Sequence, residues 1–122
     1  MIVYYTTLTK HLFDNESVEA SHEIESEEWD IKDTRGLFSL QYYVAGDGTL
    51  QLAYKLSNDG TNYVYPTTAA SIETGIVKTS GIDSDGRDLI IFSPEFSRYI
   101  KIVAEETGLS SNCTIDLWVA TQ

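Results

Sequence analysis

Two histidines, His11 and His22, are the side chains best suited to act as a general base near neutral pH. Nucleophilic catalysis also needs a hydroxyl or thiol and an orienting group beside the base. Neither histidine stands in a motif that supplies them, and His22 shares a predicted strand face with Val18 and Ile24. The two histidines are also too far apart in the sequence to form a familiar metal-ligand pair. We therefore expect no catalytic centre and no enzyme activity.

One acidic segment, residues 83–88, could bind a cation. Asp83, Asp85 and Asp88 offer carboxylate oxygens, and Gly86 allows the chain to bend, as in calcium loops. The EF-hand pattern requires a glutamate at its twelfth position, and Pro94 stands there instead. Asp-Gly is also an ordinary turn sequence, which is the interpretation that we favour. The segment remains a weak calcium candidate, and we expect no other metal and no cofactor.

The many acidic residues limit the kinds of partner that the chain can bind. The chain has 122 residues, and its 19 acids against 8 bases give a net charge of −11. Such a charge argues against nucleic acid and anionic membrane as direct partners. The acids are dense between Asp14 and Asp33, where Lys32 is the one base. This density is typical of a solvated face, and the alternative is an acidic arm that reaches a basic neighbour.

Three aromatic residues are the candidate contact residues. Tyr43, Tyr99 and Trp118 alternate with apolar residues, so they occupy the side of each predicted strand that faces away from the core. Exposed aromatic side chains on a sheet serve either as stacking platforms for sugars or as protein contacts. A loop or the N-terminal segment could instead cover them.

Strands must position these side chains, because the dominant hydrophobic period is two. Segments 38–44, 50–56, 100–104 and 113–119 alternate apolar and polar residues, and turn sequences separate most of them. Gly46-Asp47-Gly48 predicts a hairpin between the first two segments. Residues 71–86 predict a long surface loop. The pattern predicts an all-β fold, an antiparallel β-sandwich or jelly roll of about eight short strands.

The chain length fits a single β-sandwich domain over residues 1–122. Residues 1–28 form its N-terminal part, a possible strand or arm followed by the acidic segment, with strands predicted at 2–8 and 18–25. Cys113 is the single cysteine, so no internal disulfide can form, and its alternation predicts a buried thiol. The start of the sequence lacks the pattern of a secretory signal, so we expect synthesis in a reducing cytosol.

Several stretches resemble small β-sandwich, jelly-roll-like structural proteins of tailed bacteriophages, such as capsid decoration or cement proteins. The strand and turn element around Ser57-Asn58-Asp59-Gly60 and the strand Arg98-Tyr99-Ile100-Lys101-Ile102 are also similar to pieces of discoidin-like, sugar-binding jelly rolls. The stretches that carry the phage resemblance are residues 29–34, 48–64, 92–102 and 114–120.

The phage resemblance implies a non-enzymatic virion component, made in the host cytoplasm. It would bind and stabilise a capsid protein lattice or form a small neck or tail part. Its partners would be major capsid or tail subunits and other copies of itself, with a trimer as one arrangement. The alternative is a carbohydrate-binding module or host-adhesion domain that uses the exposed aromatic residues.

Overall fold

The computed structural model describes residues 7–31, 34–66 and 71–122. Within these ranges the chain forms nine β-strands and no helix, and the described part of the chain therefore holds no helix able to cross a membrane. The strands are β1 (Leu8–Val18), β2 (Glu23–Glu25), β3 (Trp29–Asp30), β4 (Phe38–Gly46), β5 (Leu50–Ser57), β6 (Ser71–Ile76), β7 (Arg87–Phe92), β8 (Tyr99–Glu106) and β9 (Cys113–Thr121).

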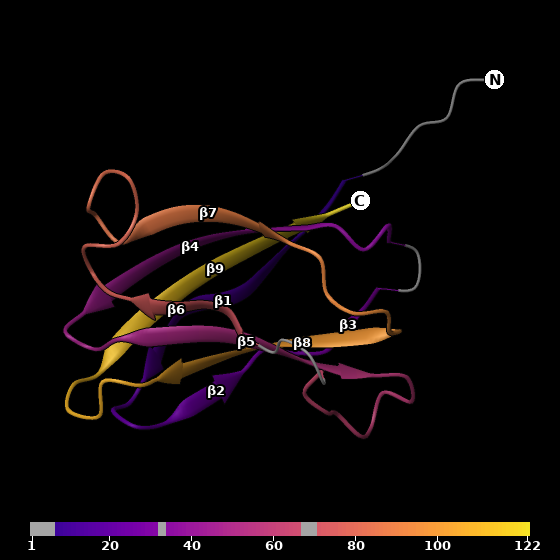
Figure 1. Ribbon diagram of the computed structural model, residues 1–122, viewed down its shortest axis with the longest axis horizontal. Helices are drawn as coiled ribbons and strands as arrows, with labels where there is room; N and C mark the ends of the chain where they lie inside the picture. The colour runs from indigo at the N-terminus through magenta and orange to yellow at the C-terminus, as the bar shows by residue number, and fades with distance from the viewer. Residues whose placement is uncertain (1–6, 32–33, 67–70) are drawn as a thin grey trace.

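The strands form two antiparallel sheets that pack face to face (Figure 1). Sheet A has the order β1-β9-β4-β7, and sheet B has the order β2-β8-β5-β6, with β3 also pairing with β8. Most connections cross from one sheet to the other, as in jelly rolls. The predicted all-β sandwich is therefore confirmed, with nine described strands where about eight were expected.

The core lies between the sheets and is built by the alternation that the sequence shows. The inward residues of the central strands β4, β5, β8 and β9 are almost fully buried. Cys113 lies among them, as predicted, and burial raises the pKa of its thiol to about 11. The buried apolar side chains are Phe13, Val18, Ile31, Phe38, Leu40, Tyr42, Val44, Leu50, Leu52, Tyr54, Leu56, Ile76, Ile100, Ile102, Ala104, Cys113, Ile115, Leu117 and Val119.

The predicted hairpin around Gly46-Asp47-Gly48 is wrong. β4 pairs with β7 and β9, whereas β5 pairs with β6 and β8. The short turn therefore carries the chain across the core, so that Leu40 and Leu52 lie on inward faces of opposite sheets. Alternation identifies the buried face of each strand but not its pairing partner, so a hairpin and this arch have the same sequence pattern.

The predicted strand 18–25 is also wrong, because a turn interrupts it. Ser21 has a positive φ of 64°, and the His22 amide donates to the Glu19 carbonyl, which closes a tight turn. The turn places Val18 in sheet A and Ile24 in sheet B. His22 is consequently an exposed turn residue whose Nδ1 lies 2.8 Å from the Ala20 carbonyl oxygen. Of the other predicted N-terminal strand, residues 2–6 lie outside the described ranges.

Part of the segment expected to be a loop, residues 71–86, is a strand. β6 occupies Ser71–Ile76 at the edge of sheet B and pairs with β5 through an irregular register. Its sequence hides it, because Gly75 lies in the left-handed region at φ 70° and Ile76 is the one fully buried residue of the strand. The remaining residues, 77–86, form the loop that leads to β7.

The turns at one end of the sandwich, on the left in Figure 1, are tied together by the buried carboxylate of Glu106. Its Oε2 accepts hydrogen bonds from the amides of Thr49 (2.8 Å) and Gly108 (2.7 Å). Its Oε1 accepts from the amides of Ser21 (3.1 Å) and Leu109 (2.7 Å). These donors, above all the Thr49 amide, hold the Glu106 pKa at about 2 against the opposing effect of burial. One carboxylate thus joins the β1–β2, β4–β5 and β8–β9 turns.

Candidate functional site

The outward side chains of β4, β7 and β9 form the outer surface of sheet A, which we call the A face. Strand register sets them in rows: Ile91 lies beside Ser39, Leu89 beside Gln41, and Arg87 beside Tyr43. On the other side of β4, the outward residues of β9 continue these rows. The A face comprises Ser39, Gln41, Tyr43, Ala45, Arg87, Leu89, Ile91, Thr114, Asp116, Trp118 and Ala120.

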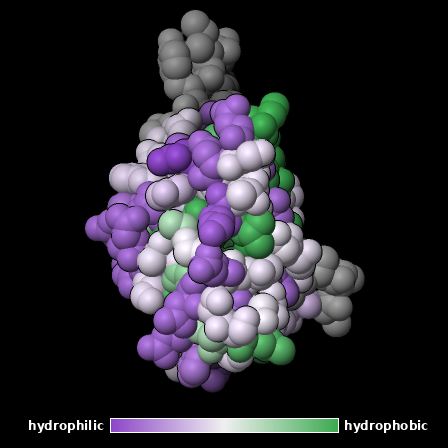
Figure 2. All heavy atoms as spheres, turned by 90° about the vertical axis from the view of Figure 1, so that its left-hand side faces the viewer, coloured by the Kyte–Doolittle hydropathy of each residue, from purple (hydrophilic) through white to green (hydrophobic). Residues whose placement is uncertain are grey.

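Large apolar side chains of the A face are open to solvent. Leu89 is 56% exposed, Ile91 68% and Trp118 43%. Leu89 and Ile91 lie on β7, one of the two edge strands of sheet A, so within the described residues one backbone side of their strand has no paired strand. By contrast, the turn end of the sandwich, seen in Figure 2, is largely hydrophilic, and hydrophobic residues gather toward the right-hand side of that view. Exposed apolar side chains grouped on an edge are typical of an interaction surface.

The two aromatic rings of the A face are each held by a neighbouring side chain. The His11 ring stacks on Trp118 with the ring centres 4.1 Å apart and the planes 4° from parallel. The Arg87 guanidinium lies 4.1 Å from the centre of the Tyr43 ring. Both rings are therefore fixed in orientation before any partner arrives, which lowers the entropy lost on binding.

A shallow apolar groove continues the A face toward the C-terminal end of β9. It has a volume of about 260 Å³, and none of the residues that line it carries an ionisable side chain. Ser39, Ile91 and Ala120 belong to both the groove and the A face. The lining residues are Thr7, Leu37, Phe38, Ser39, Ile91, Ala120, Thr121 and Gln122.

Tyr99, the third aromatic candidate, lies on the opposite side of the molecule. It begins β8 on the outer surface of sheet B, which we call the B face, defined by the outward residues of β2, β5 and β8 and by the crossing segment 61–66. Tyr99 is half-buried, and the Arg98 guanidinium lies 5.1 Å from its ring centre. The structure thus brings Tyr43 and Trp118 together on the A face and leaves Tyr99 apart from them.

The B face is charged and is covered by its own chain. Lys55 and Lys101 both pair with Glu25, and the hydrogen bond from Lys55 lowers the Glu25 pKa. Tyr65 and Val103 line the same concavity on this face, and Val103 is only 1% exposed although it occupies an outward position of β8. Val103 is therefore buried without a partner, whereas Val64 and Tyr65 of the crossing segment stay 65% and 46% exposed.

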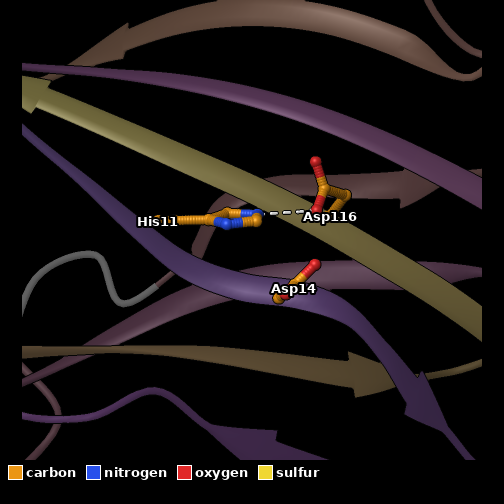
Figure 3. A group of neighbouring side chains, drawn as sticks. All are labelled: His11, Asp14 and Asp116. Atoms are coloured by element: carbon orange, nitrogen blue, oxygen red, sulfur yellow. Dashed lines mark hydrogen bonds and ion pairs between the residues drawn. The ribbon is translucent and has the colours of Figure 1, made fainter.

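A cluster of three metal-ligating side chains lies where β1 meets the A face (Figure 3). One ligand atom each of His11, Asp14 and Asp116 lies within 4.8 Å of the others. His11 Nε2 is 2.7 Å from Asp116 Oδ1, which also accepts a hydrogen bond from the Asn15 amide at 3.3 Å. Imidazole and carboxylate side chains in one group can bind a divalent metal ion.

The three aspartates of the calcium candidate do not converge. Asp83 is exposed in the loop, and Asp85 hydrogen-bonds the amide and guanidinium of Arg87. Asp88 occupies the inward side of β7, where it pairs with Tyr42. Among the described residues, only the His11 cluster gathers three metal-ligating groups. Calcium binding at residues 83–88 stays a prediction, and the three carboxylates that it would use do not converge in the structure.

The sequence reasoning missed the exposed residues Leu89 and Ile91. It named His11 but missed its grouping with Asp14 and Asp116. A signal for the first two was present, since the run Leu89-Ile90-Ile91-Phe92 is apolar on both faces of its strand. In an edge strand such a run exposes one apolar row. No comparable signal exists for the His11 cluster, because irregular pairing of β1 creates it.

The comparisons with known proteins show the fold alone. No protein-family model and no curated protein matches the chain. Solved structures do match: the PBSX exported protein XepA has a TM-score of 0.60 at 12% identity over 93% of this chain. The SPBc2 prophage-derived protein YomS has a TM-score of 0.53 at 10% identity, with both chains covered in full. The C-terminal CBM6 of LamC from Zobellia galactanivorans has a TM-score of 0.51 at 11% identity, over 96% of this chain and all of the module.

These similarities confirm the predicted resemblance at the level of architecture. The neighbours include a prophage-derived protein and a jelly-roll module. This chain spans about a third of XepA, 36% of its length. At such low identities the shared sandwich does not carry a function from one protein to another.

Proposed function

We propose that this protein is a non-enzymatic virion structural protein that binds another protein subunit through the A face. Within that role, a capsid decoration or cement protein is the form that we favour, and a small neck or tail component is the second. The proposal rests on the resemblance to phage structural proteins, and the prophage-derived neighbour with the same fold supports it.

The observation that carries the proposal is the exposure of Leu89 and Ile91 on an edge strand, next to Trp118. A partner that covers these side chains would remove apolar surface from water, at roughly 25 cal/mol per Å². A partner strand could also pair with the open side of β7. A protein subunit offers both kinds of contact.

The charge of the chain fits a protein partner on the outside of a shell. A net charge of −11 repels packaged DNA, and a subunit on the outer surface does not have to approach it. Copies of this chain could also contact one another, and a trimer around a symmetry axis is the arrangement that we propose for a lattice site.

The second candidate function is carbohydrate binding. The specific observation in its favour is Trp118, whose indole is backed by His11 and remains 43% exposed beside the polar side chain of Gln41. A flat aromatic ring next to hydrogen-bonding groups is suited to stacking on a sugar. The jelly-roll CBM6 neighbour has the same architecture.

Sedimentation of a native lysate of the source through a dense cushion tests the primary proposal. We expect the protein in the pellet at a fixed ratio to a major shell protein. Recovery only as a small soluble species would contradict the virion role. Retention on a glycan array, lost in Trp118→Ala without a change in melting temperature, would then establish the second candidate.

A further inference from the structure

Irregular pairing in β1 places two metal-ligating side chains on one surface. His11 lies opposite Trp118 on the outer side of sheet A, whereas Phe13 lies opposite Leu117 and points into the core. Residues two apart in a regular strand share a face, so the shift in register between His11 and Phe13 reverses the alternation. Asp14 consequently returns to the outer surface, on the same side as His11.

Asp116 of the neighbouring strand β9 completes the group. Figure 3 shows the His11 ring pointing toward Asp116, with Asp14 close by on β1. The stack on Trp118 and the 2.7 Å contact with Asp116 fix the His11 ring. His11 and Asp116 are each about a quarter exposed, so an ion could reach them from solvent.

The third side chain of the group has no competing contact. Among the described residues, none forms a hydrogen bond or ion pair with the exposed Asp14 carboxylate. Its oxygen nevertheless lies within 4.8 Å of an oxygen of Asp116, in a chain that already carries a net charge of −11. A divalent cation between the two carboxylates would replace their repulsion with attraction.

We propose that His11, Asp14 and Asp116 bind a zinc ion. One imidazole nitrogen and two carboxylate oxygens match the ligands that zinc accepts in tetrahedral sites. Calcium and magnesium prefer six or more oxygen ligands, so an imidazole nitrogen disfavours them. Three protein ligands leave a fourth position for water. The ion would fasten the edge strand β1 to β9, and this site is independent of the proposed virion role.

Binding of zinc chloride to the tag-free chain tests the site, because a histidine tag would itself bind zinc. The chain has one other histidine, the remote His22, and its one cysteine is buried, so competing ligands are few. At a zinc concentration about a hundredfold above the dissociation constant, the ratio of folded to unfolded protein rises about 100-fold. We expect a higher melting temperature that EDTA reverses and a change in the fluorescence of Trp118, which the His11 ring contacts.

Two matched variants locate the ion. Asp14→Asn removes one ligand from an exposed position and relieves the repulsion between the carboxylates, so it does not lower the melting temperature without metal, and it abolishes the response to zinc. Asp83→Asn makes the same chemical change in the loop before β7 and leaves the response intact. The proposal is overturned if the wild type does not respond to 1 mM zinc, because a dissociation constant above about 1 mM would mean very weak binding. It is equally overturned if Asp14→Asn responds like the wild type, or if calcium binds more tightly than zinc.

Discussion

The A face and the B face differ in how deeply the outward apolar side chains of their strands are buried. On the B face, Val103 occupies an outward position of β8, lines a concavity together with Tyr65 of the crossing segment, and is 1% exposed. On the A face, Leu89 and Ile91 point outward from β7 and are more than half exposed. An outward apolar residue of a strand is thus buried on the B face, whereas two such residues are exposed to solvent on the A face.

The charges of the two faces follow the same division. On the B face, Lys55 and Lys101 pair with Glu25, and Lys101 also lies 4.5 Å from the centre of the Tyr63 ring. Both lysines of this face are therefore paired within the chain. On the A face, Arg87 and Tyr43 are in contact, but no described segment crosses Leu89 and Ile91. This difference supports the proposal that the A face is the contact surface.

Loss of the Glu106 carboxylate has the largest expected effect, because both faces require the two sheets to be held together at the turn end. In Glu106→Gln, an amide nitrogen would face backbone N–H donors that now share one carboxylate oxygen, such as those of Thr49 and Gly108. We expect the melting temperature to fall by roughly 10 °C or more in thermal unfolding. A fall of less than about 2 °C would show that the turns hold without this carboxylate.

The same carboxylate predicts how stability depends on pH. Its pKa is about 2 in the folded chain and near 4.5 when unfolded, so its ionised form favours the folded state. This stabilisation is complete above about pH 4.5 and is lost as the pH falls from 4.5 toward 2. Chemical denaturation across this range should show a steeper acid loss in the wild type than in Glu106→Gln. Equal slopes would contradict the assignment.

A pair of alanine substitutions tests the comparison between the faces directly. Val103→Ala removes buried methyl groups on the B face and should lower the free energy of unfolding by about 2 kcal/mol. Ile91→Ala removes a larger side chain from an exposed position and should change it by less than about 0.5 kcal/mol. Urea denaturation measures both. Equal losses would mean that the A face is covered by its own chain.

Charge on the B face gives the smallest effect. Glu23 and Glu105 are exposed and directly opposite each other on β2 and β8, so their like charges repel. Glu105→Lys converts this pair to an attractive one and should stabilise the fold by roughly 0.5 kcal/mol. The gain should shrink in 1 M salt, where charges on the surface are screened. A gain that is insensitive to salt would have another origin.

The buried side of most strands could be predicted from the sequence, whereas their connections could not. Alternation places Leu40, Leu52 and Ile115 in the core because a half-buried strand repeats every two residues. The same alternation cannot distinguish a hairpin from the arch at Gly46-Asp47-Gly48, because both bury the same residues. β6 was missed because only Ile76 of that strand is fully buried.

The candidate site was predictable in part for a similar reason. Tyr43 and Trp118 follow from alternation, since each is an outward residue in a regular strand. Tyr99 follows the same pattern but belongs to the other sheet, and sequence patterns do not assign a strand to a sheet. His11 and Asp14 share a surface only because the register of β1 against β9 shifts between these two residues. No periodic sequence pattern encodes such a shift.

The most direct test of the A face as the contact surface is binding of variants to particles depleted of the native protein. Leu89→Glu combined with Ile91→Glu adds two charges to the A face. The control, Thr61→Glu combined with Val64→Glu, adds two charges at exposed positions of the segment that crosses the B face. We expect the A-face variant to lose binding by about 100-fold or more while the control binds like the wild type, both with near-native melting temperatures. Equal binding by the A-face variant and the wild type would contradict the account.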